Sequence, residues 1–79
     1  MTDTTQLREL IEQSGLKYKY IAEKLGITAY GLQKKIENKT QFKTTEVKIL
    51  CEILHINSLK KKEEIFFAKE VDLKSTKEA

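Results

Sequence analysis

The sequence contains no proline and no tryptophan, and it has only three glycines and one cysteine in 79 residues. A single cysteine cannot form an internal disulfide, and we interpret Cys51 as a small buried apolar residue of a cytoplasmic protein. No apolar run reaches the roughly 18 residues that suggest a transmembrane helix. Residues 1–10 lack the basic and apolar regions of a secretory signal. These features favour one small cytoplasmic domain.

Patterns that carry catalysis or metal binding are also missing. The chain has no paired carboxylate site, no nucleophile beside a base and no glycine-rich phosphate loop. His55 is the single histidine, and no second metal-type residue stands at ligand spacing from it. We therefore expect no enzyme activity, no metal, no cofactor and no small-molecule ligand.

The most informative stretch is Tyr18–Lys39, which predicts two short helices around a tight turn. In the first helix, 18–25, apolar residues recur at helical spacing. Gly26 follows at once, where a helix ends in a residue that accepts a positive φ. Thr28 is a good N-cap for a second helix that runs to about Asn38. The outward face of that helix is predicted to carry Thr28, Tyr30, Gln33 and Lys34.

Positive charge is concentrated on this stretch. The net charge of the chain is +3, but the segment Lys17–Lys43 has seven lysines against two glutamates, and the remainder is slightly acidic. An ordinary solvated helix face is one interpretation. A footprint for phosphates explains the location of the lysines better.

Three further helices are predicted around this unit. The first runs from about Thr5 to Ser14, with Asp3 or Thr4 as its cap, and the fourth begins after a Thr44 cap. The fifth follows a cap at Asn57 or Ser58. Phe42, alone in a polar loop, is expected to plug the core. The inward residues predicted for the fifth helix are Leu59, Ile65 and Phe66.

The end of the chain changes character, and we divide it into a domain of residues 1–67 and a tail of residues 68–79. Phe67, Val71 and Leu73 occupy alternate positions, with Lys69 in the same register, which predicts a short strand over 69–74. A lone strand is unstable, so it would pair with another copy of the chain. A frayed tail is the alternative. The apolar residues left over for a dimer contact are Ile53, Ile56, Phe67, Val71 and Leu73.

From Gln6 to about Phe67 the chain resembles the Cro/repressor-type (XRE-like) helix-turn-helix family, and most closely the small Cro-like regulators of phages of Gram-positive hosts. The residues that carry the resemblance are Ile21-Ala22-Glu23-Lys24-Leu25-Gly26-Ile27-Thr28, Leu32, Ile36, Asn38-Lys39, Phe42 and Glu46. The resemblance implies an all-α, five-helix bundle of the lambda-repressor-like type, with the helix-turn-helix at helices two and three. It also implies a transcriptional regulator that binds double-stranded operator DNA as a homodimer. A protein-interaction module, such as an antirepressor that captures another regulator, is the alternative.

The same resemblance places the third helix in the major groove and assigns candidate contacts. The residues expected to read bases are Thr28, Ala29, Tyr30, Gln33 and Lys34. Phosphates are expected to bind at Lys17, Tyr18 and Lys19, and at Asn38, Lys39, Thr40, Lys43 and Thr44. The expected dimer contacts are Phe67, Val71 and Leu73.

Five positions depart from the family pattern, among them Tyr18, where many relatives have Gln, and Ala29, where many have a charged or polar residue. Gly31 stands inside an exposed helix, where glycine costs roughly 1 kcal/mol relative to alanine; either it permits close approach to DNA or it is tolerated. Lys35 stands where many relatives have an apolar residue, and Ile36 takes the inward place. Asn38 ends the helix in place of glycine, since asparagine tolerates the left-handed region.

Overall fold

The computed structural model describes residues 1–68, which form five α-helices and, within that span, no strand. The all-helical fold class is therefore confirmed for this part of the chain. The strand predicted for 69–74 lies outside the described residues. The helices are α1 (Thr4–Ser14), α2 (Tyr18–Leu25), α3 (Ala29–Ile36), α4 (Thr44–Ile53) and α5 (Leu59–Phe66).

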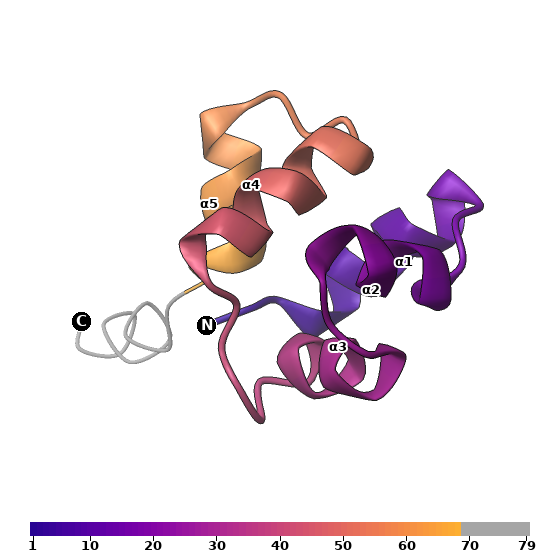
Figure 1. The fold of residues 1–79 in the computed structure, drawn as a ribbon. Helices are drawn as coiled ribbons and strands as arrows, with labels where there is room; N and C mark the ends of the chain where they lie inside the picture. Colours follow the sequence, from indigo (N-terminus) through magenta and orange to yellow (C-terminus); the bar gives the residue numbers. More distant parts are fainter. Residues whose placement is uncertain (69–79) are drawn as a thin grey trace.

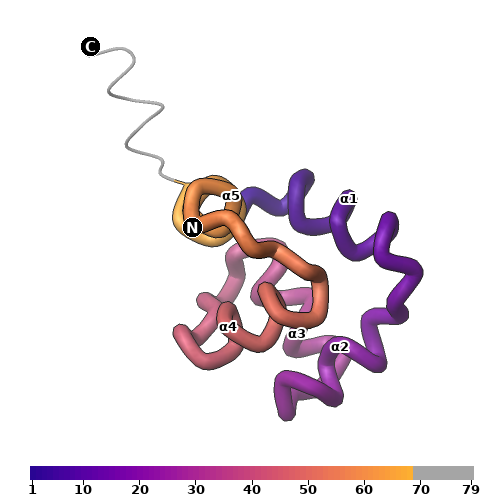
Figure 2. The backbone as a smooth tube through the Cα atoms, turned by 90° about the horizontal axis from the view of Figure 1, so that it is seen from above, coloured from indigo at the N-terminus to yellow at the C-terminus, as the bar shows by residue number. Residues whose placement is uncertain are grey.

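The helices pack so that α3 lies at one edge of the molecule. The second helix contacts both α3 and α4, whereas α1 contacts α3 and α5. In Figure 1, α3 and the loop that follows it form the lower edge of the view, and α5 stands at the opposite side beside α4. Figure 2, seen from above, places α4 over α3, with α1 and α2 curving around one side. Residues 28–30, at the start of α3, are exposed.

All five helices contribute to a single core. Leu7, Ile21 and Leu32 are completely buried and come from three different helices. Phe42 packs against this core as predicted, with its ring edge-on to Phe66 at 5.8 Å between centroids. The remaining buried apolar residues are Ile11, Ala22, Leu25, Ile36, Val47, Leu50, Cys51, Leu54, Ile56, Ile65 and Phe66.

Two apolar residues differ from the sequence prediction. Leu59 was expected to point inward, but it is 67% exposed. It is the first residue of α5, whereas the buried residues of that helix, Ile65 and Phe66, lie in its last turn. Ile56, one of the apolar residues predicted to remain available for a dimer contact, is buried in the core.

Most helix ends lie where the sequence predicts them. Asp3, Thr28 and Ser58 each accept a hydrogen bond from a backbone N–H in the first turn of their helix. The N-cap of α4 is Lys43, one residue before the predicted Thr44, because the Glu46 carboxylate accepts a hydrogen bond from the Lys43 N–H at 2.8 Å. The third helix ends at Ile36, two residues earlier than predicted.

Gly26 shapes the turn between α2 and α3. Its φ is 75° and its ψ is 28°, which is the left-handed region, and the next N–H, of Ile27, donates to Ala22 O at 3.0 Å. A Cβ added at Gly26 would meet nothing within 4 Å. Conformation rather than space therefore requires glycine here.

We expect Gly26→Ala to lower the free energy of unfolding by roughly 1–2 kcal/mol, the cost of a left-handed L-residue. Urea unfolding monitored by circular dichroism measures this change. A matched control is chemically synthesised protein with D-alanine at the same position, which accepts positive φ and should unfold like the wild type. Equal losses for the L- and D-forms would show that the side chain, not the backbone conformation, is at fault.

Candidate nucleic-acid interface

The outward side of α3 presents a compact set of polar and aromatic side chains. Thr28, Ala29 and Tyr30 are exposed, and Tyr30 is 72% exposed, the largest fraction of any large apolar residue among residues 1–68. Gln33 and Lys34 are partly exposed on the next turn. The opposite side of the helix is anchored by Leu32 and Ile36, which are completely buried. Four of the predicted base-reading residues thus lie on the solvent-facing part of α3, and the fifth, Thr28, is its N-cap.

Two of these residues contact each other. The Lys34 ammonium lies 5.3 Å from the centroid of the Tyr30 ring, four residues earlier on the helix. A cation over an aromatic face at an exposed site is stabilised by about 0.5–1 kcal/mol. The stacking orders a long, flexible lysine on the surface of α3 in the free protein.

Gly31 sits over the N-cap of the same helix. Its N–H donates to the Thr28 hydroxyl at 2.9 Å. A Cβ at this position would come within 3.2 Å of that hydroxyl oxygen. Glycine therefore leaves space for the Thr28 hydroxyl that caps the helix, which is a local structural reason for its presence.

The end of α3 is held by the N-terminal segment. The backbone of Thr2 forms two hydrogen bonds of 2.8 Å with the Asn38 side chain, one in each direction. The Thr4 hydroxyl donates to Ile36 O at 2.6 Å, and Arg8 pairs with Glu37 at 2.9 Å. The helix is consequently fixed at its C-terminal end by residues more than 25 positions away in the sequence.

Asn38 takes the left-handed conformation predicted for it, with a φ of 66°. It ends the helix as glycine would, and the next N–H, of Lys39, returns to Lys34 O at 2.8 Å. Asn38 is exposed, and its amide both holds Thr2 and orients the following loop, so its predicted phosphate contact stays a prediction.

A buried ion pair, which no sequence pattern predicted, joins α3 to α4. Lys35 Nζ lies 2.9 Å from Glu46 Oε1 and also donates to Gln41 O at 3.0 Å. The two charged side chains are only 13% and 7% exposed. The same carboxylate oxygen accepts the Lys43 N–H. This network ties the C-terminal part of the loop 37–43, at Gln41 and Lys43, to α3. It also removes Lys35 from the surface charge that the sequence suggested.

The network also sets the pKa of Glu46. Burial alone would raise that pKa, but the hydrogen bonds from the Lys35 ammonium and the Lys43 N–H, with the charges of both lysines, outweigh burial. The pKa of Glu46 therefore lies below its ordinary value. The carboxylate is charged near neutral pH and remains the counter-ion of Lys35.

The predicted phosphate contacts cluster at the starts of two helices. Both α2 and α4 follow a lysine, Lys17 and Lys43, whose side chain forms no cap. First-turn N–H groups point outward at a helix start and favour an anion. Lys19 is exposed near the first of these starts, and Lys39, Thr40 and Thr44 are exposed around the second. Tyr18 differs, because it is partly buried against the core.

The residues predicted for dimerisation are only partly described. Phe67 caps α5 and is 51% exposed. Val71 and Leu73 lie outside the described residues.

Within residues 1–68, no group of three or more His, Cys, Asp or Glu side chains is placed to hold a metal ion. No helix in that span is long and apolar enough to cross a membrane.

Comparisons with protein-family models, with curated proteins and with solved structures gave no match to this chain.

Proposed function

We propose that this protein is a sequence-specific, double-stranded DNA-binding transcriptional regulator with a lambda-repressor-like helix-turn-helix formed by α2 and α3. The observation that carries the proposal is the solvent-facing side of α3 with its N-cap, where Thr28, Ala29, Tyr30, Gln33 and Lys34 lie together. Leu32 and Ile36 anchor the other side of the helix in the core. A major groove about 12 Å wide admits one α-helix. The chemistry of this face suits base edges.

Gln33 and Lys34 are the polar readers in this proposal. A glutamine side chain bonds bidentately to adenine, and a lysine ammonium bonds to the acceptors of guanine. Ala29 offers only a methyl contact, for example with thymine. Tyr30 contributes a hydroxyl donor, and its ring holds the Lys34 ammonium on the same face of α3 through a cation–π contact.

Phosphate contacts would flank this face and fix its register. Lys17 and Lys19 stand at the start of α2, and Lys39, Thr40, Lys43 and Thr44 surround the start of α4. Such contacts position a protein on a duplex but carry no sequence information. A homodimer on two half-sites about 34 Å apart would supply the specificity that one short helix lacks. In this setting the protein acts as a Cro-like phage repressor.

Selection of bound sequences from a random duplex pool tests the proposal. We expect the enriched sequences to converge on a palindrome whose half-sites are separated by about one helical turn. With four phosphates neutralised per monomer, log K should fall with log salt with a slope of about −3.6 per monomer. No enrichment, together with no mobility shift at low ionic strength, would contradict DNA binding and favour the alternative, an antirepressor that binds another regulator.

A further inference from the structure

Residues 2–4, at the entry to α1, make hydrogen bonds to the last turns of two other helices. The Asp3 N–H donates to Ile65 O of α5 at 2.6 Å. The Thr4 hydroxyl donates to Ile36 O of α3, also at 2.6 Å. The last carbonyls of a helix have no partner within that helix, so both bonds satisfy groups that α3 and α5 cannot satisfy themselves. In Figure 1 this segment, drawn in indigo, passes between α3 and the lower end of α5.

The same segment also holds the loop that follows α3. Thr2 is only 8% exposed, and its N–H and carbonyl each bond to the Asn38 side chain at 2.8 Å. The next two N–H groups, of Lys39 and Thr40, both return to Lys34 O, at 2.8 and 3.3 Å. The position of Asn38 therefore sets where the two side chains that follow it begin.

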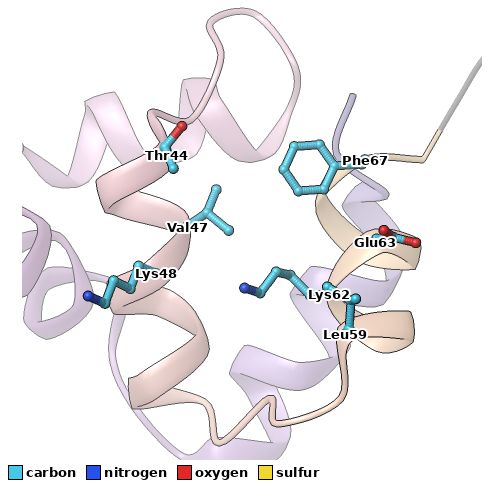
Figure 3. A pocket seen from close by; sticks show the side chains of 7 residues that line it. All are labelled: Thr44, Val47, Lys48, Leu59, Lys62, Glu63 and Phe67. Atoms are coloured by element: carbon cyan, nitrogen blue, oxygen red, sulfur yellow. The ribbon is translucent and has the colours of Figure 1, made fainter.

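The position of α5 gives its bond to this segment more weight. A groove of about 570 Å³ lies between α4 and α5, and Figure 3 shows Val47 on its α4 side and Leu59 on its α5 side. Leu59 and Phe67 line the groove and are 67% and 51% exposed, so α4 leaves this side of α5 uncovered. The fifth helix is held from its other side, by core residues and by the hydrogen bond from Asp3.

We propose that residues 2–4 position the phosphate-binding loop 38–40 and couple it to the end of α5. Asn38 is a positioning residue in this proposal, and it acts through Lys39 by holding Thr2. A loop that is ordered in the free protein does not lose that conformational freedom on binding, so less of the contact energy is spent on ordering it. The role in DNA binding rests on the proposed function; the coupling between the loop and α5 does not.

Amide hydrogen exchange of the free, full-length protein tests the coupling. Asn38→Gly removes both hydrogen bonds to Thr2 and keeps the left-handed backbone, which glycine accepts. We expect it to speed exchange of the Asp3 N–H, on the α5 side, by about two- to tenfold, the effect of losing one or two ordinary hydrogen bonds. Thr4→Val removes the hydroxyl that donates to α3, and it should speed exchange of the Lys39 N–H in the same way.

A matched control is Ser58→Ala, which removes one side-chain hydrogen bond, to the Lys61 N–H, at the far end of α5. The loss of this N-cap should lower stability without changing local exchange at Asp3 or Lys39. Amides of the buried helices report any general loss of stability in all three variants. An Asp3 N–H that exchanges at the wild-type rate in Asn38→Gly would overturn the coupling.

Binding to random duplex over a range of salt concentrations tests the positioning role. Asn38→Gly should bind about two- to tenfold more weakly than the wild type, with a shallower salt slope, whereas Ser58→Ala should bind like the wild type. In a Lys39→Ala background, Asn38→Gly should cost little more, because a positioning residue acts through the group that it positions.

Two binding results would overturn the positioning role. One is an Asn38→Gly variant that binds like the wild type. The other is a loss that adds in full to that of Lys39→Ala, which would assign Asn38 a direct phosphate contact of its own. A wild type that shows the coupling in hydrogen exchange but binds no duplex at low ionic strength would remove the proposed function and leave the coupling in place.

Discussion

We expect Glu46→Ala to lower the free energy of unfolding by about 3 kcal/mol, a large fraction of the stability of so small a domain. The substitution leaves Lys35, whose side chain is 13% exposed, without its counter-ion. It also removes the acceptor of the Lys43 N–H. Urea unfolding near neutral pH measures the loss.

The exposed ion pair between Arg8 and Glu37 is the matched control. Its two side chains are 45% and 38% exposed, so Arg8→Ala should cost less than about 1 kcal/mol. The double variant Lys35→Met with Glu46→Leu should recover most of the stability, because replacing both partners of a buried pair is often neutral. A loss below 1 kcal/mol for Glu46→Ala would mean that Lys35 escapes to solvent at little cost.

The same pair gives the stability a defined pH dependence. The pKa of Glu46 is lower in the folded protein than its ordinary value. Its contribution is therefore complete above about pH 4.3, where an unfolded glutamate titrates, and disappears as the pH falls through the lower folded pKa. The pKa of Asp3 is also lowered, chiefly by the N–H of Gln6, so it contributes in the same acidic range. The difference between wild type and Glu46→Gln isolates the Glu46 part, and it should shrink below pH 4.

Local signals in the sequence predicted the local structure well. The bounds of α2, the positive φ of Gly26 and the Thr28 cap follow from residues that are neighbours along the chain. Asn38 was expected to replace glycine at the end of α3, and it does. His55, which also takes a positive φ of 59° after α4, was not predicted, because no glycine or asparagine marks that position.

Contacts between distant residues could not be predicted in the same way. Lys35 was recognised only as a departure from a family pattern, and Glu46 only as one of the residues that carry the resemblance. Their pairing depends on how the loop 37–43 brings α4 against α3. The pair of hydrogen bonds between Thr2 and Asn38 joins residues 36 positions apart, and no periodic pattern in the sequence predicts such a contact. Leu59 was misplaced because helical spacing says which side a residue occupies but not where the neighbouring helix ends.

The sharpest functional expectation separates Gln33 from Lys39. Both are polar residues near α3, but Gln33 stands on its outward side and Lys39 follows its end with a side chain 66% exposed. Gln33→Ala should change which base is preferred at one operator position, with a loss of about 1–3 kcal/mol in discrimination. Lys39→Ala should weaken binding to all duplexes alike and make the salt slope shallower by about 0.9 per monomer.

Binding of both variants to the selected operator, to single-base variants of it and to random duplex, each over a range of salt concentrations, distinguishes the two roles. Lys24→Ala is a suitable control, since that lysine stacks on Tyr20 of α2 and belongs to neither predicted set. Equal losses on cognate and random DNA for Gln33→Ala would remove it from the base-reading residues. The proposal would then rest on Lys34, whose ammonium is already held over the Tyr30 ring on the same face of α3.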